Sequence, residues 1–313
     1  MLELDVAHSG RDSASVTTHS AISVVSALAS GRGVTIGIAI PCAVEVQRIR
    51  GGAARQRLVV DSAGAEDSHG LVRTCVLDAL NHLSQELAKT ETLFVKIRSA
   101  IPPAVGLKSS SAVSAAVVKA VLELYSDGVM DADEVLKISC SASIEAGASI
   151  TGAYDDAAAS LLGGLVFADN PKFKILKRAS FPTEKFGSIV LLLVPERKKR
   201  FTSSIDTSRF AHQKKESLEA FQYALHGDVS QAMFLNSIVQ CLALGYRMRP
   251  ITTALSGGAT AAGISGKGPT VAAICLTDKQ AERVGRIWQD QNPDCRVLRT
   301  GVWQGEENPV RRK

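Results

Sequence analysis

One segment of the chain combines glycine, hydroxyl groups and a lysine directly before a predicted helix. It runs from Ile101 to Ala112 and contains Lys108 followed by three serines. A helix start offers N–H groups and the positive end of the helix dipole, and a glycine before it lets backbone amides close around a phosphate. The segment therefore indicates a phosphate site whose hydroxyls could also bind magnesium. Its candidate residues are Pro103, Gly106, Leu107, Lys108, Ser109, Ser110, Ser111 and Ala112.

The same residues allow a plainer interpretation, because serine is a common helix cap. Both interpretations stay open at this point. The Walker pattern GxxxxGK[ST] is absent here and around Gly266 to Gly268, which excludes an ordinary P-loop kinase.

A second segment places three carboxylates around a glycine-containing loop. Glu145 ends one predicted helix, and Asp155 and Asp156 begin the next. One carboxylate could bind a magnesium ion while another orients or deprotonates a hydroxyl nucleophile. Paired aspartates at a helix start are also ordinary capping residues. The pair alone therefore does not decide between a catalytic and a structural role.

A third segment, Gly257 to Thr270, is dense in small residues. Such a stretch permits close approach of the backbone to a ligand or to another backbone, although it is equally compatible with a tight turn before a strand. We expect it to contribute to a substrate-binding loop. The candidate residues are Gly263, Ser265, Gly266, Lys267 and Gly268.

Helix and strand patterns alternate along the chain and predict an α+β protein with two sheet-containing lobes. After a loose extension (1–13), we expect helices at 20–29, 71–87, 112–125, 131–145 and 155–163, with strands at 34–40, 43–49, 56–60, 93–97 and 165–168. Further on, strands are expected at 188–194, 270–276 and 295–301, and helices at 207–226, 229–248 and 278–289. The predicted domains are residues 1–170 and 171–313.

Composition narrows the class of protein. The 313 residues are 45% hydrophobic and 21% charged, which excludes a disordered or fibrous chain. A net charge of +5 with only 5% aromatic residues suits a small anion better than nucleic acid. Six scattered cysteines without a CxxC pair are typical of buried thiols in a reducing compartment. With no leader or membrane span in the sequence, we predict a soluble cytoplasmic protein; its oligomeric state stays open.

In order and separation, the three segments resemble the motifs of the GHMP kinases, the family of galactokinase, homoserine kinase and mevalonate kinase. The resemblance covers roughly residues 15–301. It implies ATP and Mg²⁺ as cofactors, and a fold with an N-terminal mixed α/β lobe and a C-terminal ferredoxin-like lobe. The family's phosphate loop usually reads Gly-Leu-Gly-Ser-Ser-Ala, and Lys108 replaces its second glycine.

The resemblance also implies roles for single residues. Ser110 corresponds to the magnesium-binding hydroxyl and Glu145 to the magnesium-binding carboxylate. The family's catalytic aspartate commonly follows that glutamate by eleven positions, which favours Asp156 over Asp155 as the catalytic residue, with both kept as candidates.

Within the family the motifs most resemble those of archaeal-type shikimate kinases, through Gly106 to Ala112, Thr151 to Ala157 and Ala262 to Pro269. This implies phosphorylation of the shikimate 3-hydroxyl by ATP. Shikimate carries a carboxylate, so Arg197 and Lys199 of the basic loop at 196–200 are candidate contacts, unless that loop is only a solvated surface.

Three positions depart from that pattern: Ser26 replaces an expected asparagine, Ala39 an expected aspartate, and Arg32 the usual lysine. The alternatives are therefore a homoserine or mevalonate kinase, or a catalytically silent nucleotide-binding sensor with the same fold.

Overall fold

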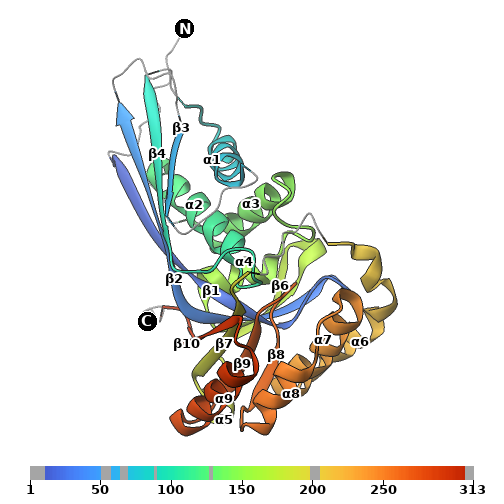
Figure 1. Ribbon diagram of the computed structural model, residues 1–313. Helices are drawn as coiled ribbons and strands as arrows, with labels where there is room; N and C mark the ends of the chain where they lie inside the picture. The colour runs from blue at the N-terminus through green and yellow to red at the C-terminus, as the bar shows by residue number, and fades with distance from the viewer. Residues whose placement is uncertain are drawn as a thin grey trace, which may run out of the picture.

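The computed structural model describes residues 11–50, 58–63, 70–87, 90–126, 130–197 and 205–306. Within these residues the chain forms two sheets, each with helices packed against it (Figure 1). The α+β class expected from the sequence is confirmed. None of the helices in the described part of the chain has the length and hydropathy needed to cross a bilayer.

The first sheet is organised around one long strand, β2 (Arg32–Arg50). β1 (Ser13–Val25) pairs antiparallel with β2 along one edge. On the other edge, β4 (Glu91–Ser99) pairs with the C-terminal half of β2 and β5 (Leu165–Asp169) with its N-terminal half. β3 (Leu58–Ala63) lies parallel to β4, and β6 (Lys174–Ala179) antiparallel to β5.

Four helices pack against this sheet and against one another: α1 (Leu71–His82), α2 (Ser109–Tyr125), α3 (Ala132–Glu145) and α4 (Tyr154–Leu162) (Figure 1). Helix α2 is central, since it contacts β1, β2 and the other three helices. Its alanines and valines are buried on nearly every side, from Ala112 to Leu124. An all-round apolar helix of this kind must lie in the core, and it fixes the phosphate-loop segment at its start.

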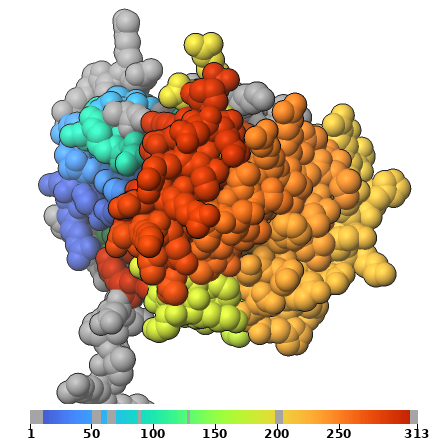
Figure 2. Space-filling model, turned by 60° about the horizontal axis from the view of Figure 1, so that its bottom comes forward, coloured from blue at the N-terminus to red at the C-terminus, as the bar shows by residue number. Residues whose placement is uncertain are grey.

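The second sheet is antiparallel with the strand order β10-β7-β9-β8, from β7 (Ile189–Pro195), β8 (Ala261–Ile264), β9 (Val271–Cys275) and β10 (Cys295–Gly301). In order of sequence this is 4-1-3-2 with helices after the first and third strands, so the ferredoxin-like lobe is confirmed. Figure 2 shows this lobe, orange to red, as one continuous face beside the first lobe. Its helical segments are α5 (Thr183–Phe186), η3 (Thr207–Gln213), α6 (Lys214–Leu225), α7 (Val229–Leu244), α8 (Arg249–Ser256) and α9 (Asp278–Gln291).

The helix predicted at 20–29 is wrong, because residues up to Val25 belong to strand β1. Every residue from Ser20 to Val25 is buried, so the segment lacks the polar–apolar alternation of a half-exposed strand. A short apolar run of this kind has no period that separates strand from helix. Of the predicted N-terminal extension, residues 1–10 lie outside the described residues, and Ser13 already begins β1.

The break predicted at Pro41 is also wrong, since β2 continues through it. In the pairing with β1, His19 faces Pro41 but Ser20 faces Ile38, so Ala39 and Ile40 form a bulge. A bulge accommodates proline, which cannot donate a hydrogen bond to the ladder.

Three differences concern the second half. The segment predicted as one helix at 207–226 is η3 followed by α6, helix α8 was not predicted, and β8 lies inside the glycine-rich segment. The domain division at residue 170 stays a prediction. β6 pairs with β5, and the N–H of Trp303 donates to Gly37 O, so parts of the second half complete the first sheet.

Candidate active site

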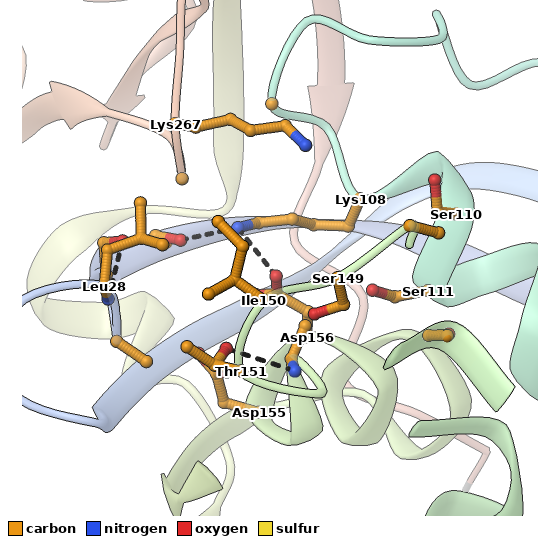
Figure 3. Close-up of a pocket in the computed structure, with 18 of the residues that line it drawn as sticks. Leu28, Lys108, Ser110, Ser111, Ser149, Ile150, Thr151, Asp155, Asp156 and Lys267 are labelled. Atoms are coloured by element: carbon orange, nitrogen blue, oxygen red, sulfur yellow. Dashed lines mark hydrogen bonds and ion pairs between the residues drawn. The ribbon is translucent and has the colours of Figure 1, made fainter. Parts of the chain in front are cut away.

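The three candidate segments meet at one cavity of about 880 Å³, open mouth included, between the two lobes (Figure 3). The lining combines the end of β1, the phosphate-loop segment, the loop between α3 and α4 and the loop between β8 and β9. The predicted site residues in the lining are Gly106, Leu107, Lys108, Ser109, Ser110, Ser111, Asp155, Asp156, Gly266 and Lys267.

Helix α2 begins at the cavity without a side-chain cap. Its N-cap residue is Lys108, in the left-handed conformation at φ 63°, and the Lys108 side chain makes no capping hydrogen bond. The three serines lie inside that turn and do not cap it, which removes the plainer interpretation of the segment. An uncapped helix start at a cavity can bind an anion through its N–H groups.

Strand β1 holds the phosphate-loop segment in place. The Ser20 hydroxyl donates to Leu107 O at 2.8 Å, and the Thr18 hydroxyl donates to Ala112 O at 2.9 Å. Both hydroxyls are buried. Ala112 and Pro103 are not among the lining residues, and Ala112 is packed in the core.

Helix α4 also begins at the cavity, but with two carboxylates in its first turn. Asp155 is 2% exposed and accepts hydrogen bonds from the Thr35 hydroxyl at 2.6 Å and from Asn170 Nδ2 at 2.8 Å. A Cβ atom on Gly33 would lie 2.2 Å from Asp155 Oδ2, so only glycine fits beneath this carboxylate. Burial, and then the neighbouring charge of Asp156, raises the pKa of Asp155.

Asp156 is more exposed than Asp155 and connects the starts of α2 and α4. Its Oδ2 is 3.0 Å from Lys108 Nζ, and its Oδ1 is 3.1 Å from the Thr35 hydroxyl. The ammonium of Lys108 also donates to the Ser23 hydroxyl at 2.8 Å. The lysine that distinguishes this phosphate loop therefore joins it to the catalytic candidate (Figure 3).

The third segment closes over the first. The buried Ser265 hydroxyl donates to Gly106 O at 2.7 Å, and Thr270 N donates to Val105 O at 3.2 Å. A Cβ atom on Gly106 would lie 2.4 Å from Ser265 O, so the contact requires glycine. Ser265 and Gly268 make this contact without lining the cavity, whereas Gly263, also outside the lining, packs against Met233 and Ser237 of α7.

Two further predicted residues that the structure describes, Glu145 and Arg197, do not line the cavity. Glu145 is exposed at the end of α3 and is not among the lining residues; its charge instead raises the pKa of Asp78, secondary to the effect of burial. The structure therefore does not pair Glu145 with Ser110. Arg197 is exposed beyond β7 and does not line the cavity, and Lys199 lies outside the described residues.

Sequence patterns missed several polar groups of the site. Thr35 and Asn170 hold Asp155, while Ser23, Ser143 and Ser149 line the cavity. Thr35 and Asn170 are fully buried polar residues, but burial is not visible in a single sequence.

The three departures from the shikimate kinase pattern lie in different places. Ser26 lines the cavity, and its N–H donates to Asn236 Oδ1 at 2.9 Å. Ala39 is exposed in the β2 bulge and does not line the cavity, and Arg32 lies 4.0 Å from Asp169. Of the three, only Ser26 is placed to affect a bound molecule directly.

Comparison with protein families matches both lobes. Residues 74–164 match the GHMP kinases N terminal domain, and residues 219–294 match the GHMP kinases C terminal domain. The first match contains the starts of both α2 and α4, and the second contains the loop between β8 and β9.

Similar curated proteins cover nearly the whole chain. A shikimate kinase of Methanothrix thermoacetophila is 34% identical over 91% of this chain and 92% of its own length. A shikimate kinase of Pyrococcus furiosus is 36% identical over 87% of this chain and 93% of its own.

Solved structures with the same fold are more distant in sequence. The mevalonate kinase of Methanococcus jannaschii has a TM-score of 0.72 at 17% identity, covering 96% of this chain and 99% of its own. A homoserine kinase of Cytophaga hutchinsonii has a TM-score of 0.69 at 17% identity, covering 95% and 97%. These two likenesses establish the fold.

Proposed function

The chain belongs to the GHMP kinase family, and on that premise we propose that it is a shikimate kinase, which transfers the terminal phosphoryl group of ATP to the 3-hydroxyl of shikimate. Relatives named shikimate kinase, at 34% and 36% identity over most of both chains, support this acceptor. The observation that carries the proposal is the 3.0 Å ion pair between Lys108 and Asp156, which joins a phosphate-binding helix start to a carboxylate.

The triphosphate binds at the start of α2. The N–H groups of Ser109 to Ser111 and the dipole of a long helix attract the phosphates, and the Lys108 ammonium adds a positive charge. Phosphoryl transfer depends mainly on positioning and on stabilising negative charge. A rigid, core-packed helix with an uncapped start meets both requirements.

Magnesium fits this arrangement as a partner of the phosphates. Mg²⁺ in proteins usually keeps several waters and binds one or two protein oxygens besides phosphate oxygens. The Ser110 hydroxyl, in the lining at the start of α2, is the protein oxygen we assign to it. Bound there, the ion would neutralise charge on the phosphates. Glu145 remains only a predicted ligand, because it does not line the cavity.

Asp156 orients the acceptor hydroxyl and takes up its proton. Its carboxylate lines the cavity, and the ion pair with Lys108 directs it toward the phosphate-binding loop. Asp155 is less suited to contact the acceptor, because it is 2% exposed and its oxygens accept hydrogen bonds from Thr35 and Asn170, whereas the Asp156 side chain is 15% exposed. We therefore assign the catalytic role to Asp156 and a supporting role to Asp155.

The acceptor lies between Asp156 and the end of β1. Hydroxyls from Ser23, Ser26 and Thr151 line this side of the cavity and can bind the hydroxyls of a polyol. The acceptor carboxylate requires a cation. Arg197 and Lys199 stay proposals for that contact, and a cytoplasmic location likewise stays a prediction.

The test is coupled ADP release with Mg²⁺ and ATP, using shikimate, homoserine and mevalonate as separate acceptors. We expect turnover with shikimate alone. Turnover with homoserine or mevalonate instead would reassign the acceptor within the family. Clear ATP binding without ADP release from any acceptor would favour a catalytically silent nucleotide-binding sensor and contradict the proposal.

A further inference from the structure

A second lysine reaches the cavity from the other lobe. Lys267 lies in the loop between β8 and β9 and extends over the cavity opposite Lys108 (Figure 3). Its backbone is held on both sides. The Tyr246 hydroxyl donates to Lys267 O at 2.7 Å, and the Ser265 hydroxyl ties the loop to Gly106 O at 2.7 Å. The position of Lys267 relative to the phosphate loop is therefore fixed by one contact within its own lobe and one between the lobes.

The charges of the lining favour a role for this lysine. Among the described lining residues, the charged side chains are Lys108, Lys267, Asp155 and Asp156. Lys108 is compensated by Asp156 at 3.0 Å. A triphosphate brings several negative charges, and in the transition state charge spreads over the oxygens of the transferred group. A second cation facing the phosphate loop would stabilise this negative charge on the transferred group.

Burial of the Lys267 side chain disfavours its charged form. Burial, and then the charge of Lys108, lowers the pKa of Lys267 to about 8, against an opposing effect of Asp156. Lys108 at the start of α2 and Asp156 in α4 are charged groups that act on it. A phosphate placed between the two lysines would stabilise both ammonium groups.

We propose that Lys267 is a catalytic residue that binds the transferred phosphoryl group from the C-terminal lobe, opposite the start of α2. The inference rests on the proposed kinase function and deepens it. The reacting phosphate then lies between N–H groups of the first lobe and an ammonium of the second. No bond forms to Lys267, which acts only by charge and hydrogen bonding.

The first test compares Lys267→Met with the wild type in the ADP-release assay. Removing one donor that acts on transition-state charge typically lowers kcat by roughly a hundred- to a thousandfold, and we expect a loss of that size. Affinity for Mg·ADP should stay within about threefold, since ADP lacks the transferred group. Lys279→Met, an exposed lysine in α9, is the matched control and should leave both quantities unchanged.

The second test is the pH profile of kcat/KM for ATP, which reports groups of the free enzyme. The protonated amine is the active form, so the wild-type value should fall as pH rises above about 8. Lys267→Arg keeps the charge but does not titrate in this range. We expect the arginine variant to retain measurable activity and to lose this fall. This variant also decides the matter if Lys267→Met fails to fold.

Two results would overturn the assignment: a kcat within threefold of wild type in Lys267→Met, or the same fall above pH 8 in Lys267→Arg. The outcome is separable from that of the proposed function. If the wild type releases no ADP with any acceptor, calorimetry decides the role of Lys267. Lys267→Met must then weaken binding of Mg·ATP at least tenfold more than binding of Mg·ADP, and equal weakening would contradict the proposal.

Discussion

Helices α2 and α4 begin at the same cavity and in the same way, but they carry opposite chemistry. Each starts from a residue in the left-handed conformation, Lys108 at φ 63° and Ala153 at φ 51°, and neither has a side-chain cap. The first turn of α2 has no acidic residue, whereas the first turn of α4 has Asp155 and Asp156. The start of α2 is therefore available to a bound anion, whereas the start of α4 already carries the anionic side chains of the protein.

The difference shows that the same feature, an uncapped helix start, can serve both the phosphate donor and the hydroxyl acceptor. The dipole at the start of α2 is available to phosphates, which arrive with the nucleotide. The dipole at the start of α4 stabilises carboxylates that belong to the protein. Lys108 connects the two, since it precedes α2 and pairs with Asp156 of α4. A phosphate donor and a hydroxyl acceptor are thereby directed to the same place.

The largest effect should come from the α4 side. Asp156→Asn removes the proton acceptor while keeping the shape of the side chain, and loss of a general base typically lowers the rate by roughly 10²- to 10⁴-fold. We expect kcat to fall about a thousandfold with ATP affinity within threefold, measured by ADP release and calorimetry. Asp278→Asn, in the first turn of α9, is the control and should leave kcat unchanged. Strong loss of ATP binding in Asp156→Asn would show that the start of α4 also binds the nucleotide, and would contradict the division of roles between the two helix starts.

A smaller effect should follow from removing Lys108, which joins the two helix starts through its ion pair with Asp156. Lys108→Met eliminates one charged contact to phosphate and the partner of Asp156. A hydrogen bond to a charged group contributes about 1.5–3 kcal/mol, so we expect nucleotide affinity to fall roughly ten- to a hundredfold. Calorimetry with Mg·ADP measures this. Lys119→Met, later in the same helix, should bind like wild type. An unchanged affinity in Lys108→Met would show that N–H groups alone bind the phosphates.

The buried carboxylate of α4 should give stability a pH dependence of a defined sign. The pKa of Asp155 is raised by burial above its ordinary value of 3.8, so the folded protein holds this proton more tightly than the unfolded chain. The resulting stabilisation is present at low pH and lost as pH rises from 3.8 through the raised pKa. In Asp155→Asn this loss should be absent. Urea unfolding at a series of pH values measures it, and parallel curves for the two proteins would refute the assignment.

The smallest effect is expected at a helix start away from the cavity. Thr277 caps α9 in a capping box with Gln280. Thr277→Ala should lower the free energy of unfolding by about 1 kcal/mol and leave kcat and nucleotide affinity unchanged. Denaturant unfolding and the ADP-release assay provide the two values. A clear loss of turnover would contradict the view that capped helix starts, such as that of α9, have only a structural role.

The sequence predicted those parts of the fold and site that depend on local pattern. The α+β class predicted from helix and strand patterns is confirmed, and the start of α2 lies at the cavity as its glycine and serines suggested. The ferredoxin-like second lobe, also confirmed, was implied by the family resemblance and not by local pattern. The start of α2 could be predicted because it depends on neighbouring residues alone. A helix that is apolar on all sides, with small residues before it, leaves few alternatives for its first residue.

What the sequence did not predict depends on contacts between distant segments. Thr35 contacts Asp155 from 120 positions away, and its side chain has no local feature that separates it from any other threonine in a strand. Residues 20–25 were misassigned because a strand covered on both faces has no alternation. Glu145 was expected at the metal from the family resemblance, and it lies at the exposed end of α3 without lining the cavity. Spacing along the chain does not determine where a helix directs its last side chain.

The most direct test of the division between the two helix starts is a crystal structure with Mg²⁺, a non-hydrolysable ATP analogue and shikimate. The account predicts phosphate oxygens about 3 Å from the N–H groups of Ser109 to Ser111. It also predicts the shikimate 3-hydroxyl within about 3 Å of the Asp156 carboxylate. Phosphates at the start of α4, or an acceptor hydroxyl remote from Asp156, would contradict it.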